Sequence, residues 1–156
     1  MELPARLRAA IDAVLADSGV SDLKAAGRAL SERYRAEIRD GRAHVANRAA
    51  ANAYLATRLP ATYAAVRASL GMAMEHLPGF VPRSLLDVGA GPGTAFFAAG
   101  HCVPELASVT LVEASAAMRA AGSALADTLD LGPRWIGSDA TAGQSDAPSA
   151  DLVPLA

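Results

Sequence analysis

The stretch Leu85-Leu-Asp-Val-Gly-Ala-Gly-Pro-Gly-Thr94 decides how this sequence is interpreted. It continues a short apolar run, which is typical of a buried parallel strand, into a glycine-rich turn that opens a helix. Gly89, Gly91 and Gly93 let the chain turn tightly and let a ligand touch the backbone, and free N–H groups at the helix start favour a polar or anionic ligand. The stretch therefore predicts a binding turn between a strand and a helix.

The chain around this turn alternates between strands and helices, as in α/β folds. Three short runs predict strands: Ser84–Val88, Ser108–Val112 and Arg134–Gly137. Two segments between them predict crossover helices: Pro92 to about Gly100 and Ser115 to about Asp127. Asp151-Leu-Val153 predicts the opening of a fourth strand. We therefore expect residues 80–156 to form part of a Rossmann-like sheet, with strands one to three and the start of the fourth.

Residues 1–79 predict an all-helical region, because apolar residues recur there at helical spacing among many alanines. Four helices are expected: one on Leu3, Leu7, Ile11 and Leu15; one with Ser21 as its N-cap, ending at Asp40-Gly41; one from about Ala43 to Thr57; and one from Pro60 to Leu77. The predicted fold class is thus α/β, with a helical N-terminal region followed by the partial sheet.

Acidic residues stand at the end of each predicted strand. Asp87 precedes the glycines, Glu113 closes the second strand, and Asp139 follows the third. A carboxylate placed like Glu113 can accept both hydroxyl protons of a ribose, so these acids are predicted to line one cleft. Structural roles are the alternatives: a turn cap for Asp87, an exposed strand end for Glu113 and ordinary loop chemistry for Asp139.

The glycine turn departs from two nucleotide motifs. A dinucleotide fingerprint expects glycine or alanine where this chain has Thr94, and a P-loop ends in Lys followed by Ser or Thr. The turn instead resembles that of Rossmann-like methyltransferases. The resemblance implies that S-adenosylmethionine lies over the turn, that Asp87 holds its methionyl end and that Asp139 meets the adenine amine. The implied cofactor-binding residues are Asp87, Gly89, Ala90, Gly91, Gly93, Glu113 and Asp139.

Charge divides the chain although the total of 156 residues carries only −2. Residues 1–80 hold 11 basic and 8 acidic residues, whereas residues 81–156 hold 3 and 8. Most of the excess lies between Arg28 and Arg67, and every base in that segment is arginine. Arginine suits phosphate recognition, so a contact to RNA through the region of Arg28, Arg35, Arg39 and Arg42 is one hypothesis. A merely solvated helix face is the other.

Several classes of protein and site are excluded by simple counts. Cys102 is the only cysteine, so the chain can form neither an internal disulfide nor a multi-cysteine metal site by itself. The N-terminal segment lacks an apolar signal region, and we expect a cytoplasmic location. The uncharged stretch Val88–Pro104 is interrupted by glycines and prolines, so we expect no membrane partner. No residue pattern suggests a metal site or a catalytic triad, and the catalytic residue stays unknown.

A closer resemblance rests on two segments: Arg58-Leu-Pro-Ala-Thr-Tyr63-Ala-Ala-Val and Phe80-Val-Pro-Arg-Ser-Leu-Leu-Asp-Val-Gly-Ala-Gly-Pro-Gly-Thr-Ala95. Together they resemble the ribosomal small-subunit Rsm22 family of methyltransferase-like proteins, over nearly all of the chain. The resemblance implies association with the small ribosomal subunit or its RNA during assembly. Family members of this kind are longer and carry a C-terminal cysteine cluster for iron–sulfur binding, whose ligands this chain does not contain. Phe96-Phe97 also stands where the family pattern has small residues and a tryptophan.

Three interpretations of function stay open at this point. The protein is a S-adenosylmethionine-dependent methyltransferase when full length, or a non-catalytic assembly factor that keeps the cofactor fold for RNA contact, or an inactive truncated fragment. Methyl transfer needs alignment of the reacting atoms more than acid–base chemistry, so the cofactor site is most of the machinery. Substrate-facing residues in this class follow the fourth strand, so we expect the present 156 residues alone to be inactive.

Overall fold

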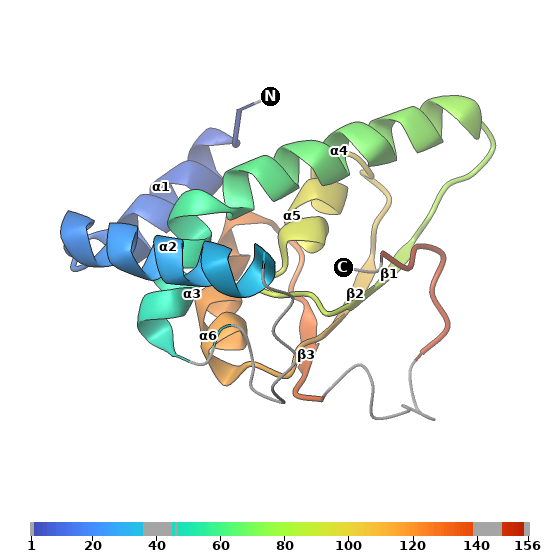
Figure 1. Cartoon of the computed structure of the whole chain (residues 1–156). Coiled ribbons are helices and arrows are strands. Elements are labelled where there is room, and N and C mark those ends of the chain that lie inside the picture. The colour runs from blue at the N-terminus through green and yellow to red at the C-terminus, as the bar shows by residue number, and fades with distance from the viewer. Residues whose placement is uncertain (1, 36–44, 46, 139–147, 155–156) are drawn as a thin grey trace.

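The computed structural model describes residues 2–35, 45, 47–138 and 148–154 (Figure 1). Helices dominate the first part of the chain, and strands alternate with helices in the second. The elements in chain order are α1 (Ala5–Leu15), α2 (Val20–Arg35), α3 (Arg48–Thr57), α4 (Leu59–His76), β1 (Ser84–Val88), α5 (Thr94–Gly100), β2 (Ser108–Val112), α6 (Ala116–Leu125), the 3₁₀ helix η1 (Ala126–Thr128) and β3 (Arg134–Ile136). The predicted fold class, helices followed by a parallel α/β unit, is confirmed.

The three strands form one parallel sheet in the order β1-β2-β3. The strands β1 and β2 have the predicted bounds, whereas β3 ends at Ile136, one residue earlier than predicted. Ser84 is paired with Ser108 and Val88 with Val112, so the carboxyl ends of β1 and β2 are level. The glycine turn and the connection after β2 therefore start from the same edge of the sheet.

The predicted fourth strand lies along β1, on the side away from β2. Leu152 makes a parallel bridge to Leu85, and its N–H and carbonyl bond to Ser84 and Leu86 at 3.1 and 2.9 Å. Asp151 fixes the start of this segment, because its Oδ2 accepts hydrogen bonds from the backbone N–H groups of Arg83 and Ser84. The order of the extended segments thus reverses at β1, which is the place where open α/β sheets bind ligands.

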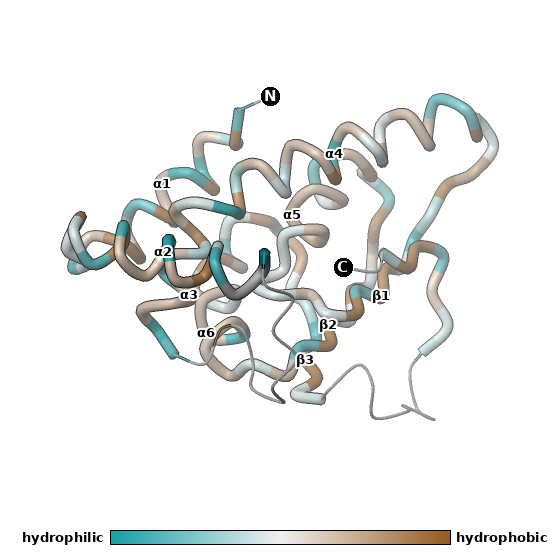
Figure 2. Tube along the Cα trace, in the orientation of Figure 1, coloured by the Kyte–Doolittle hydropathy of each residue, from teal (hydrophilic) through white to brown (hydrophobic). Residues whose placement is uncertain are grey.

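One continuous hydrophobic core joins the helical part to the sheet. Leu85, Val109 and Leu111 of the strands belong to it, as do Leu7 and Leu55 of the N-terminal helices. Both α5 and α6 connect neighbouring strands in the same direction, so right-handed crossovers place them on one face of the sheet, where α1, α3 and α4 pack against them. Figure 2 shows the strands as mainly hydrophobic segments, while hydrophilic and hydrophobic residues alternate along α2.

Three predicted helix starts are wrong, each for a local reason. The helix α5 starts at Thr94 instead of Pro92, because Gly93 has a φ of 83°, which a right-handed helix does not admit. The helix α3 starts at Arg48 instead of Ala43, with Asn47 as its N-cap accepting from the N–H of Ala50 at 2.9 Å. The helix α2 starts at Val20, so Ser21 lies inside its first turn and is not the cap. The predicted end of α2 at Asp40-Gly41 lies outside the described residues.

A buried polar network fixes α5 against α4. The Tyr63 side chain is fully buried, and its hydroxyl accepts from Arg67 Nη1 at 3.0 Å and lies 3.2 Å from His101 Nδ1. His101 Nδ1 is also 2.6 Å from the carbonyl oxygen of Phe97, and burial lowers the pKa of the imidazole, which keeps it neutral. His101 therefore packs and bonds within the fold.

Candidate functional site

The glycine turn after β1 has a backbone that only glycine adopts readily. Gly89, Gly91 and Gly93 have φ values of 76°, 56° and 83°, all in the left-handed region. The N–H groups of Gly89 and Ala90 both donate to the carbonyl of Val112, at 2.9 and 3.0 Å. Among the described residues, a Cβ built on Gly91 would meet no heavy atom within 4 Å beyond its chain neighbours. The turn is thus anchored to the end of β2 and open in front of Gly91.

Glu113 follows β2 directly and its carboxylate reaches back to the turn. Its Oε2 accepts from the N–H of Gly91 at 2.9 Å, and its Oε1 accepts from the N–H of Ser115 at 2.6 Å. The backbone of Glu113 is held in turn by β3, because its N–H donates to the carbonyl of Ile136 at 3.0 Å. The predicted proximity of Glu113 to the glycine turn is confirmed. A carboxylate accepts about four hydrogen bonds, so roughly two acceptor positions are left for a ligand.

Asp87 lies in β1 and is almost completely buried, with 2% of its surface exposed. Burial above all, together with the negative charge of Glu113, raises the pKa of its carboxyl group to about 7. Its Oδ2 atom has no hydrogen-bond partner among the described residues, and neither has the buried Oγ1 of Thr94 at the other end of the turn. Buried polar atoms are nearly always paired, so these two oxygens beside the turn are groups with which a ligand could form hydrogen bonds.

Asp139 could not be placed with these groups, because it lies outside the described residues. The described chain ends there with Gly137 and Ser138, just beyond β3. The assignment of Asp139 to the adenine of a cofactor therefore stays a prediction. Asp87, Gly89, Ala90, Gly91, Gly93 and Glu113 are all brought together at the carboxyl edge of β1 and β2.

Two side chains on α6 complete this edge. Ser115 is the N-cap: its hydroxyl accepts from the N–H of Met118 at 3.2 Å and donates to the carbonyl of Val45 at 2.6 Å. Arg119 was not singled out by the sequence. Its Nη1 donates to the carbonyls of Glu113 and Ala114 at 2.5 and 2.8 Å. The sequence pattern that could have pointed to Arg119 is its position four residues after Ser115, where the predicted helix begins.

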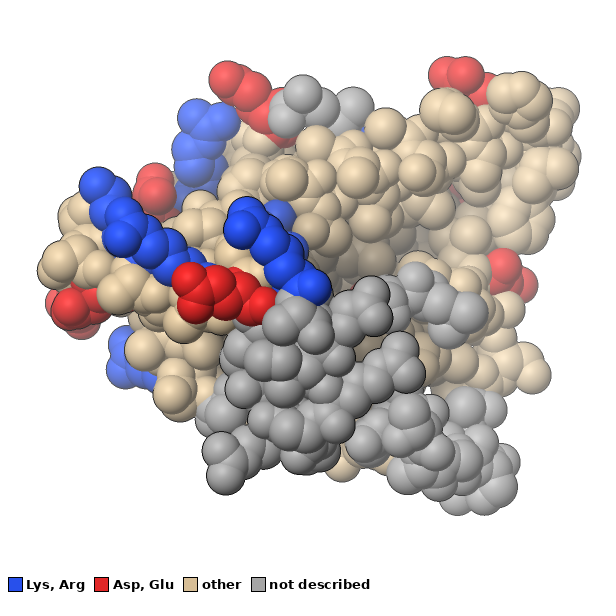
Figure 3. Space-filling view, in the orientation of Figure 1, with Lys and Arg blue, Asp and Glu red and all other residues tan. Residues whose placement is uncertain are grey.

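The helical part carries a groove with a basic lining. A groove of about 460 Å³ between α2 and α3 is lined by Lys24, Arg28 and Arg35, and Glu32 is the acidic residue among the described residues that line it. Figure 3 shows basic side chains on this side of the molecule, with acidic atoms between them. Arg28 and Arg35 of the predicted RNA-binding region thus lie on one groove, while Arg39 and Arg42 fall outside the described residues. Lys24 is an addition that the arginine pattern did not predict.

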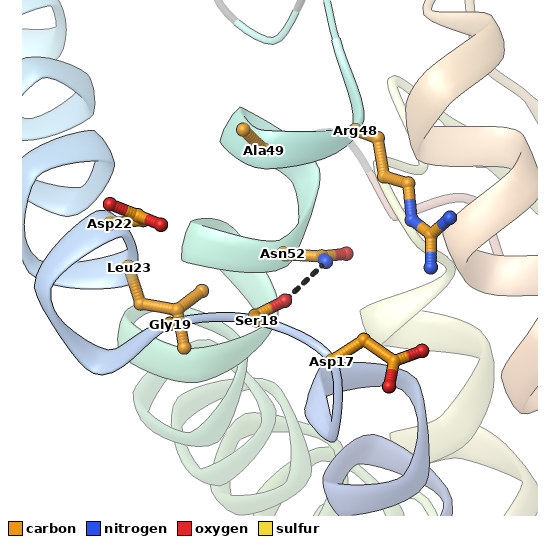
Figure 4. A pocket seen from close by; sticks show the side chains of 8 residues that line it. All are labelled: Asp17, Ser18, Gly19, Asp22, Leu23, Arg48, Ala49 and Asn52. Atoms are coloured by element: carbon orange, nitrogen blue, oxygen red, sulfur yellow. Dashed lines mark hydrogen bonds between the residues drawn. The ribbon is translucent and has the colours of Figure 1, made fainter.

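A second pocket, of about 420 Å³, lies at the turn between α1 and α2, next to the start of α3 (Figure 4). Asn52 on its floor is buried, and its Nδ2 donates to the hydroxyl of Ser18 at 2.9 Å. Asp17, Asp22 and Arg48 line its exposed rim. The hydrogen bond from Asn52 connects the turn to α3. The pocket therefore lies at a junction of helices that this bond stabilises, and its rim is polar.

Other kinds of site are absent from the described part of the chain. Within residues 2–35, 45, 47–138 and 148–154, no group of three or more His, Cys, Asp or Glu side chains could hold a metal ion. No helix among these residues has the length and hydropathy needed to cross a membrane. The candidate site is therefore the carboxyl edge of β1 and β2.

Comparison with known proteins agrees with this arrangement. Residues 48–156, more than half of the chain, match the family described as mitochondrial small ribosomal subunit Rsm22. No curated protein matches the chain. Two solved structures of the plantazolicin methyltransferase BpumL superpose with TM-scores of 0.52 and 0.53 at 17% sequence identity. One holds SAH with a monoazolic desmethylPZN analog, and the other holds SAH.

These alignments cover 85% and 83% of this chain but 48% and 46% of BpumL, so the chain spans about half the length of that enzyme. At 17% identity the similarity shows the fold alone. The predicted methyltransferase-type fold is confirmed by it, and the predicted Rsm22 resemblance is confirmed by the family match.

Proposed function

The chain belongs to the Rsm22 family, and from this premise we propose that it is a methyltransferase-like protein that binds S-adenosylmethionine and works on or with the RNA of the small ribosomal subunit. One observation carries the proposal: the unpaired, buried Oδ2 of Asp87 stands beside a glycine turn that is open in front of Gly91. A cytoplasmic location stays a prediction, because the family description names the mitochondrial subunit.

The residues of the turn suit this cofactor. Gly91 has no side chain to keep a ligand from the backbone, and the acceptor positions left on Glu113 can take the two ribose hydroxyls. Oδ2 of Asp87 would accept from the ammonium of the methionyl end, and that positive charge would favour the ionised carboxylate in a buried setting. Asp87 and Glu113 would therefore each meet a group of matching chemistry on this cofactor.

When bound, the cofactor supplies a methyl group on a sulfonium, which is already activated for transfer. The protein then needs to hold the reactants and exclude water. Glu113 does part of this by fixing the turn through Gly91 and the start of α6 through Ser115. The methyl acceptor and the residues that face it concern the activity of the whole protein. No catalytic residue is assigned within this chain.

Calorimetric titration of the 156-residue chain with S-adenosylhomocysteine tests the cofactor site. We expect Glu113→Ala to weaken binding about tenfold to a hundredfold, because hydrogen bonds to a charged group contribute about 1.5–3 kcal/mol. Glu113→Gln keeps the side-chain length and one acceptor, and should lose less. The exposed Glu105→Ala, on the connection between α5 and β2, is the matched control. Equal affinity in Glu113→Ala and Glu105→Ala would refute the assignment. A full-length protein that binds the methyl donor without transferring methyl would favour the non-catalytic assembly factor.

The basic groove between α2 and α3 supports the RNA part of the proposal. Lys24, Arg28 and Arg35 share this groove with the hydroxyl-bearing Ser31 and Thr57, which suits a phosphate backbone. We expect the triple charge reversal Lys24→Glu, Arg28→Glu, Arg35→Glu to weaken binding to single-stranded small-subunit RNA. It should also reduce the slope of log affinity against log salt by about 2, at about 0.7 per lost phosphate contact.

The control for this experiment is the pair Arg83→Glu and Arg134→Glu, two exposed arginines of the sheet part. These substitutions change the net charge of the chain without touching the groove. If the control variant lost as much RNA affinity as the groove variant, the effect would be one of overall charge, and α2 would carry only a solvated face.

A further inference from the structure

We propose that Arg119 is a nucleobase-binding residue, which forms one wall of the adenine site and fixes the strand ends beneath it. The inference rests on the proposed function, because it places the base of the same nucleoside whose ribose is assigned to Glu113. The side chain belongs to the first turn of α6 and is half-buried.

The first observation is the bond pattern of the guanidinium group. Arg119 Nη1 donates to the backbone carbonyls of both Glu113 and Ala114, at 2.5 and 2.8 Å. Two carbonyls on one cationic donor hold the connection between β2 and α6 in a single conformation. The carboxylate of Glu113 is carried by this same backbone, so Arg119 also determines where that carboxylate lies.

The second observation is how closely Gly137 approaches the guanidinium group. A Cβ on Gly137 would lie 3.0 Å from Cζ of Arg119, 3.1 Å from Nη2 and 3.3 Å from Nη1. These nearly equal distances place that position over the face of the planar group. Gly137 directly follows β3, so the guanidinium spans the carboxyl ends of two adjacent strands, β2 and β3.

The location of the base follows from the strand order. With the ribose on Glu113 after β2 and the methionyl end toward β1, the base extends in the opposite direction, toward β3. Arg119 lies there. Its Nε and Nη2 have no hydrogen-bond partner among the described residues. Their N–H groups can therefore donate hydrogen bonds to the ring nitrogens of a purine. The planar cation also stacks favourably on an aromatic ring.

The test separates the two ends of the ligand. S-adenosylhomocysteine and 5′-methylthioadenosine share the adenosine, but only the first has the amino acid. We expect Arg119→Met to lower the affinity for both ligands by the same factor, about tenfold. Gly137→Ala should lower both affinities in the same way, because its Cβ would displace the guanidinium group. Arg119→Lys keeps the charge without the planar fork and should show an intermediate loss for both ligands. Asp87→Asn, at the methionyl end, should weaken only S-adenosylhomocysteine.

Calorimetry of each variant is accompanied by its thermal unfolding, so that loss of fold is recognised, and Arg119→Lys serves where Arg119→Met fails to fold. Affinities within twofold of wild type for both ligands, or a loss confined to S-adenosylhomocysteine, would overturn the role of Arg119. Wild-type chain that binds neither ligand would overturn the proposed function, and this inference with it. Wild-type binding with unaffected Arg119 variants would overturn this inference alone.

Discussion

The two parts of the molecule treat their buried polar groups differently. In the helical part, Asn52 is paired with Ser18, and Tyr63 is paired with Arg67. At the carboxyl edge of the sheet, Asp87 and Thr94 each keep a buried oxygen that has no hydrogen-bond partner among the described residues. An unpaired buried polar atom costs about 1–3 kcal/mol, so the helical part is built for packing, while the sheet edge gives up stability at the place where a ligand would restore it.

The largest effect of an unpaired buried group on the free energy of unfolding should come from the carboxyl group of Asp87. Its pKa is raised from an ordinary 3.8 to about 7 by burial and by the charge of Glu113. Between those values the folded chain holds a proton that the unfolded chain has released, so the free energy of unfolding falls as the pH rises through this window. At about 1.4 kcal/mol per pKa unit, the loss is about 4 kcal/mol.

Asp87→Asn should remove this loss, because the amide has the same shape and does not ionise. We expect the variant to match wild type at about pH 4 and to be more stable by several kcal/mol at about pH 8. Urea unfolding across this pH range measures it, with the exposed Asp130→Asn as control. A stability difference between Asp87→Asn and wild type that does not change with pH would show that Asp87 is not the buried, uncompensated acid of the sheet edge.

The same contrast explains which features could be predicted from the sequence. The strands β1 and β2 were predicted with their observed bounds, because a buried parallel strand is a short apolar run with Gly, Ser or Pro at its ends. Gly89, Gly91 and Gly93 were predicted as a turn because their backbone conformation excludes most other residues. In these places the local sequence determines the local structure.

Other features depend on contacts between distant segments, and the sequence pattern does not contain them. The start of α3 was missed, because an alanine-rich segment has the same helical pattern on both sides of Asn47. Arg119 was missed because its role depends on Gly137, eighteen residues away, which comes beside it only when β3 joins the sheet. Sequence reasoning thus placed Asp87, Glu113 and the glycines at one sheet edge, but it did not identify Arg119, which bonds the backbone of Glu113.

Two glycines give the finest test of the comparison, because each has free space where a Cβ would be built. Within the described part of the chain, neither Gly91 nor Gly71 would bring a Cβ within 4 Å of another heavy atom, apart from atoms of neighbouring residues or of the same helix. They differ in backbone conformation: Gly91 has a φ of 56°, whereas Gly71 lies inside the helix α4. The same substitution to alanine should therefore have opposite effects in the two parts of the molecule.

We expect Gly91→Ala to destabilise the chain by about 1–2 kcal/mol, the cost of a left-handed residue with a Cβ. Gly71→Ala should stabilise it by about 0.5–1 kcal/mol, because alanine loses less conformational entropy in a helix. Paired urea unfolding of the two variants measures both signs in one experiment. Gly91→Ala should also weaken S-adenosylhomocysteine by filling the space in front of the turn, whereas Gly71→Ala should leave its affinity unchanged. A stabilising Gly91→Ala would mean that residue 91 does not need the left-handed conformation. The glycine turn would then not be the structural feature that leaves space for a ligand at this site.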